Sequence, residues 1–209
     1  MVAKGFSQIP GIDYNDVFSP VVKHSSIRTF FSIVAMRDLE LEQLDVKTAF
    51  LHGELEEEIY MDQPEGFIVP GKEYLVCKLK RSLYGLKQSP RQCYKRFDSF
   101  MLSHGFKRSE FDSCVYTKFV DGSPIYLLLY VDNMLIAAKS MKEIAALKSQ
   151  LSSEFEMKDL GAAKKILGME ITRDRKSRFL SLSQQSYVKK FLNRFNMHNA
   201  KSEIGRAHV

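Results

Sequence analysis

Several features that would fix an interpretation early are scarce in this chain. Its three cysteines, Cys77, Cys93 and Cys114, are too far apart for the close-paired ligands of a structural zinc site. Their odd number does not suggest a disulfide framework, so we expect a reducing compartment. The N-terminal residues lack the apolar core of a signal peptide, and the longest apolar run, residues 125–131, is far too short to span a bilayer.

Motifs of several enzyme classes are also missing. The chain contains no phosphate loop ending in Gly-Lys-Ser/Thr, no Gly-x-Ser-x-Gly nucleophile elbow and no His-Glu-x-x-His zinc motif. Scattered histidines are more often surface or packed residues than ligands. The chain has five of this kind: His24, His52, His104, His198 and His208. These absences weigh against P-loop enzymes, serine hydrolases and zinc proteases.

The composition is that of a globular protein able to bury a core. Of the 209 residues, 44% are hydrophobic and 27% are charged, which allows one large domain or two small ones. Lysine and arginine exceed the acidic residues by six. This excess leans mildly toward a polyanionic partner.

The chain is organised around residues 125–138, which read IYLLLYVDNMLIAA. Apolar runs rich in β-branched and aromatic residues flank Asp132 and Asn133, so we expect a hairpin with this polar pair at its tip. Two interpretations of the tip stay open. It is either a turn that simply favours Asx residues, or a rigid hairpin that presents a metal-binding carboxylate.

Hydrophobic periodicity places helices and strands on both sides of this hairpin. We expect helices at residues 26–37, 90–104, 140–155 and 184–195, with Ser89 and Ser140 as caps. We expect strands at residues 39–46, 73–79, 115–120, 166–171 and 179–182, and a turn at residues 156–161. Hairpins mixed with helices indicate an α+β fold rather than strict βαβ alternation.

Two carboxylates stand at places where a sheet can hold a metal. Asp45 lies near the end of the strand predicted at residues 39–46, and Asp132 lies at the hairpin tip. Between them, residues 78–96 are basic and are either a groove for phosphates or a solvated face. Strand-end carboxylates beside such a groove suit phosphoryl transfer assisted by two metal ions.

A series of motifs in order then identifies a family. The stretches are VAKGF, GIDYNDVFSPVVK, QLDVKTAFLHGELEEEIYM, QPEGF, LKRSLYGLKQSPRQ, LLLYVDNMLIAA, LSSEFEMKDLG, ILGMEI and LSLSQQSYVKKFL. Together they resemble the reverse transcriptase of copia-type LTR retrotransposons over nearly the whole chain. The resemblance implies a right-hand polymerase with fingers and an antiparallel palm sheet flanked by helices in residues 1–203, truncated at both ends, with the thumb incomplete or absent.

The resemblance also implies a reaction and its partners. An RNA-directed DNA polymerase joins a deoxynucleotide (dNTP) to a primer 3′-hydroxyl with two Mg²⁺ ions, or Mn²⁺, as cofactors. The other partners would be template RNA or DNA with its primer, and the rest of the polyprotein with integrase and RNase H. No membrane is involved, and the expected place is the cytoplasm, in a virus-like particle.

Residue by residue, the resemblance assigns the catalytic groups first. Asp45 and Asp132 would ligate the metals, the Val46 carbonyl would add a ligand, and Lys158 would protonate pyrophosphate. From the residues alone, Lys158 is equally an exposed loop lysine. Phe50 would be the steric gate, an aromatic ring against C2′ of the incoming sugar. Tyr84, Gly85 and Lys87 match the motif that packs on the nucleotide and the template base. Leu167 and Gly168 resemble the primer grip. From its spacing alone, Phe50 is nearly as well explained as a core residue.

The departures from the family pattern predict an impaired copy. Family members carry a second Asp where this chain has Asn133, and an amide is a poor Mg²⁺ ligand. Cys93 stands where the family usually has Trp, a change expected to leave a cavity costing roughly 3 kcal/mol or more. A coding sequence for residues 204–209 resembles a sequencing adapter, so we expect a non-native tail. The alternative function is a catalytically dead relic that at most binds nucleic acid; a host-adopted module has no positive feature.

Overall fold

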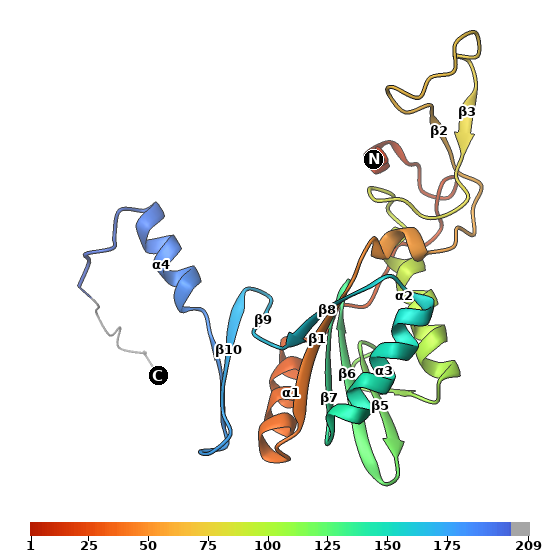
Figure 1. Ribbon diagram of the computed structural model, residues 1–209. Helices are drawn as coiled ribbons and strands as arrows, with labels where there is room; N and C mark the ends of the chain where they lie inside the picture. Colours follow the sequence, from red (N-terminus) through yellow and green to blue (C-terminus); the bar gives the residue numbers. More distant parts are fainter. Residues whose placement is uncertain (202–209) are drawn as a thin grey trace. The chain divides into compact units, whose positions relative to one another are not determined.

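The computed structural model describes residues 1–201 and separates them into two compact units (Figure 1). Unit 1 comprises residues 1–162, and the described part of unit 2 comprises residues 163–201. The tail expected to be non-native, residues 204–209, lies outside the described residues. Within residues 1–201, no helix has the length and apolar character needed to cross a membrane.

Unit 1 is built on one six-stranded sheet in which every neighbouring pair is antiparallel. In spatial order the strands are β4 (Lys107–Arg108), β5 (Val115–Val120), β6 (Ser123–Tyr130), β7 (Asn133–Ala138), β1 (Glu40–Val46) and β8 (Met157–Ala162). The central strand β7 is buried at every position after its first residue, as its unbroken apolar sequence requires. The expected α+β class is confirmed.

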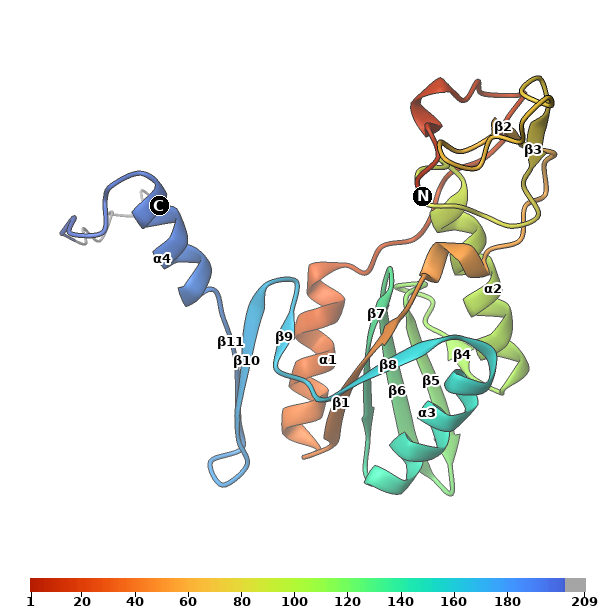
Figure 2. The same ribbon diagram turned by 45° about the horizontal axis from the view of Figure 1, so that its top comes forward.

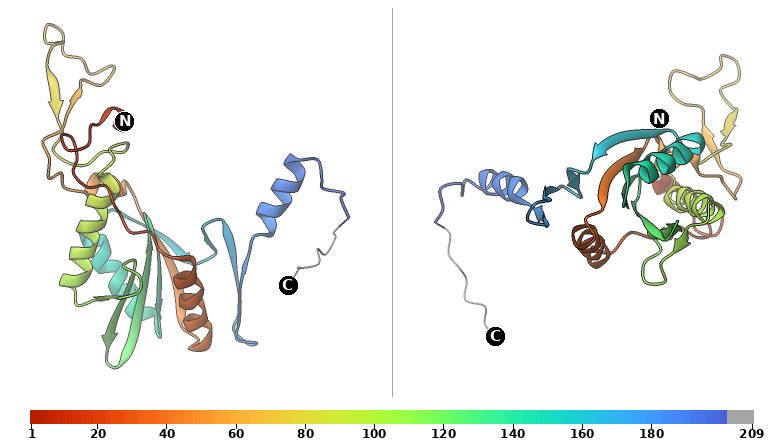
Figure 3. Two further views of the ribbon diagram at one scale, coloured as in Figure 1. Left: turned by 180° about the vertical axis from the view of Figure 1, so that it is seen from behind. Right: turned by 60° about the horizontal axis from the view of Figure 1, so that its bottom comes forward.

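Three helices of unit 1 provide most of the remaining core. They are α1 (His24–Met36), α2 (Ser89–Ser103) and α3 (Met141–Glu154). Figures 2 and 3 show α2 and α3 on the same side of the sheet. Each helix turns an apolar stripe inward, and Phe31, Met101 and Leu151 are buried examples, one from each.

The caps of these helices bear out one prediction and overturn another. The Ser140 hydroxyl accepts from the Glu143 N–H and the Glu143 carboxylate accepts from the Ser140 N–H, so α3 begins with a capping box. Ser89 is wrong as a cap, because it is the first residue of α2 and follows the cap residue Gln88. The Ser89 hydroxyl donates instead to the Leu83 carbonyl, at 2.6 Å.

Unit 1 also contains several shorter elements outside the six-stranded sheet. They are the 3₁₀ turns η1 (Gly5–Ser7) and η2 (Ala49–His52), and the two-stranded ladder of β2 (Tyr60–Asp62) with β3 (Val76–Lys78). The strand expected at residues 73–79 is therefore confirmed only in its C-terminal half, as β3.

The prediction for residues 156–161 is wrong, because most of this segment is the edge strand β8. Lys158, Asp159 and Gly161 interrupt any apolar alternation, so the sequence is typical of a turn. Pairing with β1 overrides that local signal and sets Lys158 opposite Asp45 in the register.

Unit 2 contains a three-stranded antiparallel sheet and one helix. The strands, in the order β11-β10-β9, are β9 (Lys165–Ile166), β10 (Met169–Asp174) and β11 (Phe179–Ser183). The helix α4 (Gln185–Arg194) has no buried residue. Leu167 and Gly168 were expected inside a strand but form the tight turn between β9 and β10, with φ of 51° and 75°.

Candidate active site

A backbone hydrogen bond links the end of β1 to the turn between β6 and β7. Asp45 lies opposite Asn133 in the β1–β7 register, one residue before the end of β1. The Val46 N–H donates to the Asp132 carbonyl at 2.7 Å. This bond holds the turn that carries Asp132 beside the end of β1, the strand that carries Asp45.

The turn itself differs by one residue from the expected tip. Tyr130 pairs with Asn133, so the two central residues are Val131 and Asp132, and Asn133 begins β7. Val131 has φ of 57°, which is a strained conformation for a β-branched residue. Backbone strain of this kind is often found at functional sites.

The electrostatics show that the two carboxylates sense each other. Burial raises the pKa of Asp45, the negative charge of Asp132 raises it further, and the cation of Lys158 opposes both. A site that holds two carboxylates close enough to repel favours a bound cation, which would relieve that repulsion.

Asn133 uses both ends of its amide inside the protein. Its Nδ2 donates to Asp132 Oδ1 at 3.0 Å, and its Oδ1 accepts from Gln43 Nε2 at 3.3 Å. The sequence reasoning missed Gln43. The available signal was its position two residues before Asp45 on a strand, which places the two side chains on the same face.

Phe50 and Tyr84 form an aromatic pair next to this end of the sheet. Their ring centroids are 4.9 Å apart with the planes at 54°. Burial and then the Asp132 carboxylate raise the pKa of the Tyr84 hydroxyl. The fold therefore brings the predicted gate residue, a predicted nucleotide contact and a predicted metal ligand into one neighbourhood.

Gly85 and Lys87 are held by the N-terminal segment. Gly85 has φ of 96°, and a Cβ there would lie 2.0 Å from the Ala3 carbonyl oxygen, so close packing of two backbones demands glycine. Lys87 Nζ donates to the Tyr14 hydroxyl at 3.2 Å and lies 5.0 Å from the centre of that ring. Both residues thus have a structural role here that the motif alone did not reveal.

The three remaining predicted residues are divided between the two units. Lys158 is on β8 of unit 1 and acts electrostatically on Asp45, whereas Leu167 and Gly168 form the β9–β10 turn of unit 2. The expectation of an exposed loop lysine at residue 158 is therefore wrong in its secondary structure, because the residue is in a strand.

The basic stretch at residues 78–96 is largely balanced by acids of unit 1. Ion pairs join four of its cations to carboxylates: Lys78 to Glu58, Arg91 to Asp16, Lys95 to Glu56 and Arg96 to Glu154. Surface pairs of this kind contribute little stability, but they neutralise the charge that a phosphate groove needs. The interpretation as a phosphate groove is weakened accordingly.

The charge of the chain is instead concentrated in unit 2. Residues 163–201 contain ten Lys and Arg but only two Asp and Glu, a net charge of +8. Residues 1–162 contain 20 basic and 22 acidic residues, a net charge of −2. The mild excess of the whole chain conceals this segregation.

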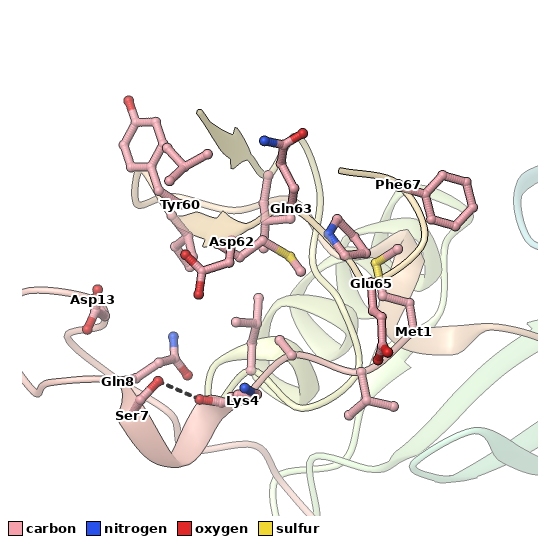
Figure 4. A pocket seen from close by; sticks show the side chains of 18 residues that line it. Met1, Lys4, Ser7, Gln8, Asp13, Tyr60, Asp62, Gln63, Glu65 and Phe67 are labelled. Carbon is pink, nitrogen blue, oxygen red and sulfur yellow. Dashed lines mark hydrogen bonds between the residues drawn. The ribbon is translucent and has the colours of Figure 1, made fainter. Parts of the chain in front are cut away.

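A separate pocket of about 740 Å³ lies between the N-terminal segment and the β2–β3 ladder. Figure 4 shows Gln8 and Asp13 of the N-terminal segment across from Tyr60 and Asp62 of β2. None of the predicted site residues lines it, so this pocket and the candidate carboxylates are distinct places.

The donor set at the carboxylates suits a hard divalent cation, with few protein ligands. Within residues 1–201, no cluster of three or more His, Cys, Asp or Glu side chains is placed to hold a metal. Asp45 and Asp132 could offer carboxylate oxygens and the adjoining Val46 a carbonyl. Mg²⁺ commonly uses one or two carboxylates together with substrate phosphates.

Comparison with known proteins agrees with this geometry. Residues 1–205 match the family described as reverse transcriptase (RNA-dependent DNA polymerase). The chain is 61% identical over 202 residues to the retrovirus-related Pol polyprotein from transposon TNT 1-94 of Nicotiana tabacum, covering 96% of this chain and 15% of that protein. It is 40% identical over 201 residues to the corresponding polyprotein from transposon RE1 of Arabidopsis thaliana, covering 96% and 14%. The chain therefore belongs to the reverse transcriptase family of copia-type transposon polyproteins.

Proposed function

We propose that this chain is the fingers and palm of an RNA-directed DNA polymerase within a retrotransposon polyprotein. The observation that carries the proposal is the Val46–Asp132 hydrogen bond, which fixes Asp45 and Asp132 at one end of the sheet. The reaction is attack of a primer 3′-hydroxyl on the α-phosphate of a dNTP, with release of pyrophosphate. Because the chain spans about a seventh of the polyproteins it matches, the activity of the whole protein is included in this proposal.

The role of the carboxylates in this reaction would be to bind metal ions beside the phosphates of the dNTP. Two Mg²⁺ ions, or Mn²⁺, would supply the activation of the hydroxyl and the stabilisation of the leaving group when bound. Asp45, Asp132 and the Val46 carbonyl are the groups that would hold them. Burial raises the pKa of Asp45 and repulsion from Asp132 raises it further; bound ions would relieve that repulsion.

The aromatic pair would select the sugar. Phe50 lies against Tyr84 next to the carboxylates, and a ring at C2′ of the incoming nucleotide would exclude a 2′-hydroxyl by its bulk. Tyr84, Gly85 and Lys87 support this wall through their contacts with the N-terminal segment.

Lys158 would act on the leaving group. It lies opposite Asp45 on β8, and an ammonium group there can give a proton to a pyrophosphate oxygen as the bond to the α-phosphate breaks. The positive charge of Lys158 also lowers the pKa of Asp45, against the larger raising effects of burial and of Asp132, so the two groups are near enough to interact electrostatically.

Unit 2 would bind the primer and template. Its net charge of +8 suits a phosphate backbone, and Leu167 and Gly168 at the β9–β10 turn are the proposed primer grip. The rest of the polyprotein, with integrase and RNase H, remains a proposed partner, and the cytoplasm a proposed location.

Asn133 sets the expected level of activity. A second aspartate would add a negative oxygen at this position, whereas the amide donates to Asp132 and accepts from Gln43. We therefore propose turnover lowered by orders of magnitude, since a well-placed metal is worth several kcal/mol at the transition state. The alternative, a relic that only binds nucleic acid, is favoured by the same engagement of both amide atoms.

Primer extension on an RNA template tests the proposal and separates it from the alternative. The chain in its polyprotein context is expected to incorporate dNTP slowly with Mg²⁺ and not at all after Asp132→Ala. Salt-dependent template–primer binding without any incorporation, by either the natural protein or Asn133→Asp, would support the relic and overturn the polymerase.

A further inference from the structure

An apolar cavity of about 320 Å³ lies in unit 1 beside the strand end and the turn that carry the candidate carboxylates. Two of its lining residues, Val46 and Val131, adjoin Asp45 and Asp132 in the sequence. Phe50, which contacts Tyr84, lines it as well. The cavity is therefore part of the support of the site and separate from the carboxylates themselves.

The polar groups around this cavity already have partners. The Ser19 hydroxyl donates to the Pro90 carbonyl at 3.3 Å, and the Tyr94 hydroxyl donates to the Ser113 carbonyl at 3.0 Å. Neither group needs a hydrogen bond from a ligand. A molecule that enters should consequently be apolar, because a polar one would lose its water without compensation.

The lining thiol does not change this conclusion. Burial, and then the charge of Asp132, raises the pKa of Cys93 to about 11, so the side chain is a neutral thiol at pH 7. No lining residue is Asp, Glu, Lys or Arg. Ions are therefore poor candidates for this cavity.

The volume and the aromatic walls define the shape of a suitable molecule. A cavity of about 320 Å³ is at the lower end of the range of roughly 300–1,000 Å³ for ligand pockets. Phe97 of α2 and Phe155 at the end of α3 face the same cavity, with ring centroids 5.9 Å apart. Flat rings pack well against such edges and faces.

We propose that this cavity is a binding site for a small uncharged aromatic molecule of one or two rings. Val17, Val21 and Val131 leave one side of this cavity open to solvent, so an arene can enter and replace water beside apolar atoms with dispersion contacts. Binding fills the space behind Val131, the strained residue of the hairpin, and so stabilises the turn that carries Asp132.

Thermal unfolding of the whole chain in increasing indole tests this site. Indole should raise the midpoint in a saturable way, since a ligand bound only by the folded state stabilises it. Cys93→Trp places a two-ring side chain in the cavity. This variant should have a higher unfolding midpoint without any ligand, and its midpoint should no longer rise with indole. The matched control Cys77→Ser, in β3, should change neither.

A second measurement uses the natural protein and needs no variant. The rate at which methyl methanethiosulfonate modifies each cysteine is followed by mass spectrometry. Saturating indole should lower the modification rate of Cys93 by at least about fivefold and leave that of Cys77 unchanged. The proposal is overturned if the Cys93 rate does not change. It is also overturned if indole raises the unfolding midpoints of the natural protein and of Cys93→Trp equally. The same holds if charged indole-3-acetate raises the midpoint of the natural protein as much as indole does.

Discussion

Units 1 and 2 of this chain differ in both burial and charge. Unit 1 carries nearly all of the fully buried side chains and is slightly acidic, whereas unit 2 has a net charge of +8 and a helix with no buried residue. The difference fits the two tasks proposed for the units. Holding two carboxylates in fixed positions needs a rigid packed sheet, while attraction of a polyanion needs charge but little core.

The largest expected effect concerns the carboxylates of unit 1. In an Asn133→Asp background, Asp45→Asn should abolish primer extension while leaving template–primer affinity within about twofold, because that affinity comes from charge elsewhere. A parallel loss of affinity and activity would contradict the division between the units.

The same substitution should also change how stability depends on pH. The folded-state pKa of Asp45 is raised, so the folded protein binds its proton more tightly than the unfolded chain and stability rises as pH falls through that range. At pH 7 the ionised group therefore opposes folding, and Asp45→Asn should raise the unfolding midpoint. The gain should disappear once the pH is below the ordinary pKa of an aspartate, and a gain independent of pH would refute this explanation.

Charge reversal in unit 2 should have the next largest effect. Lys189→Glu with Lys190→Glu on α4 should weaken template–primer binding more than tenfold and make log affinity less steeply dependent on log salt, by about one for each phosphate no longer neutralised. The matched control is Lys78→Glu with Lys95→Glu in unit 1, whose cations are paired with Glu58 and Glu56. Equal losses of affinity in the two double variants would remove the basis of the comparison.

Gln43 should have a smaller effect, through Asn133. Gln43→Ala leaves the Asn133 carbonyl oxygen without its side-chain donor and should cost about 1 kcal/mol of folding stability. Activity should fall a few-fold at unchanged KM for dNTP, because the orientation of Asp132 is disturbed and not the nucleotide contacts. Conservative Gln43→Glu, which offers no amide donor at neutral pH, should fail to rescue; full activity there would exclude this role.

The smallest expected effect distinguishes the helices of the two units. Ser140→Ala removes the capping box of α3 and should lower unfolding stability by about 1 kcal/mol. Because α4 has no side-chain cap, Gln184→Ala should be nearly neutral. Hydrogen exchange of the α3 amides measures the first, and a larger effect from Gln184→Ala would contradict the assignment of stability to unit 1.

The sequence predicted the parts of this molecule that local patterns control. Strong periodicity located α1, α2 and α3, and the apolar runs located β6 and β7. The predictions failed where tertiary pairing decides. β8 exists because β1 offers it a partner, and the hairpin tip lies at Val131 and Asp132 because the register with Asn133 requires it.

The sequence predicted which residues carry the chemistry of the candidate site but not the hydrogen bonds between their side chains. Asp45 and Asp132 could be named from strand ends and motifs, whereas the link from Gln43 through Asn133 to Asp132 depends on side-chain geometry across two strands. The charge segregation was visible in the sequence but required the boundary between the units to be recognised. The role of Gly85 depended on contact with Ala3, which is 82 residues away in the sequence.

Whether Asn133 limits the site is tested most directly by measuring single-nucleotide incorporation by the natural chain and by Asn133→Asp, in the same polyprotein context with Mg²⁺ and saturating template–primer. We expect the added carboxylate to raise the rate about 100-fold or more, because a better-held metal is worth several kcal/mol. Equal rates for the two proteins, with both fully active, would contradict the claim that Asn133 limits this site.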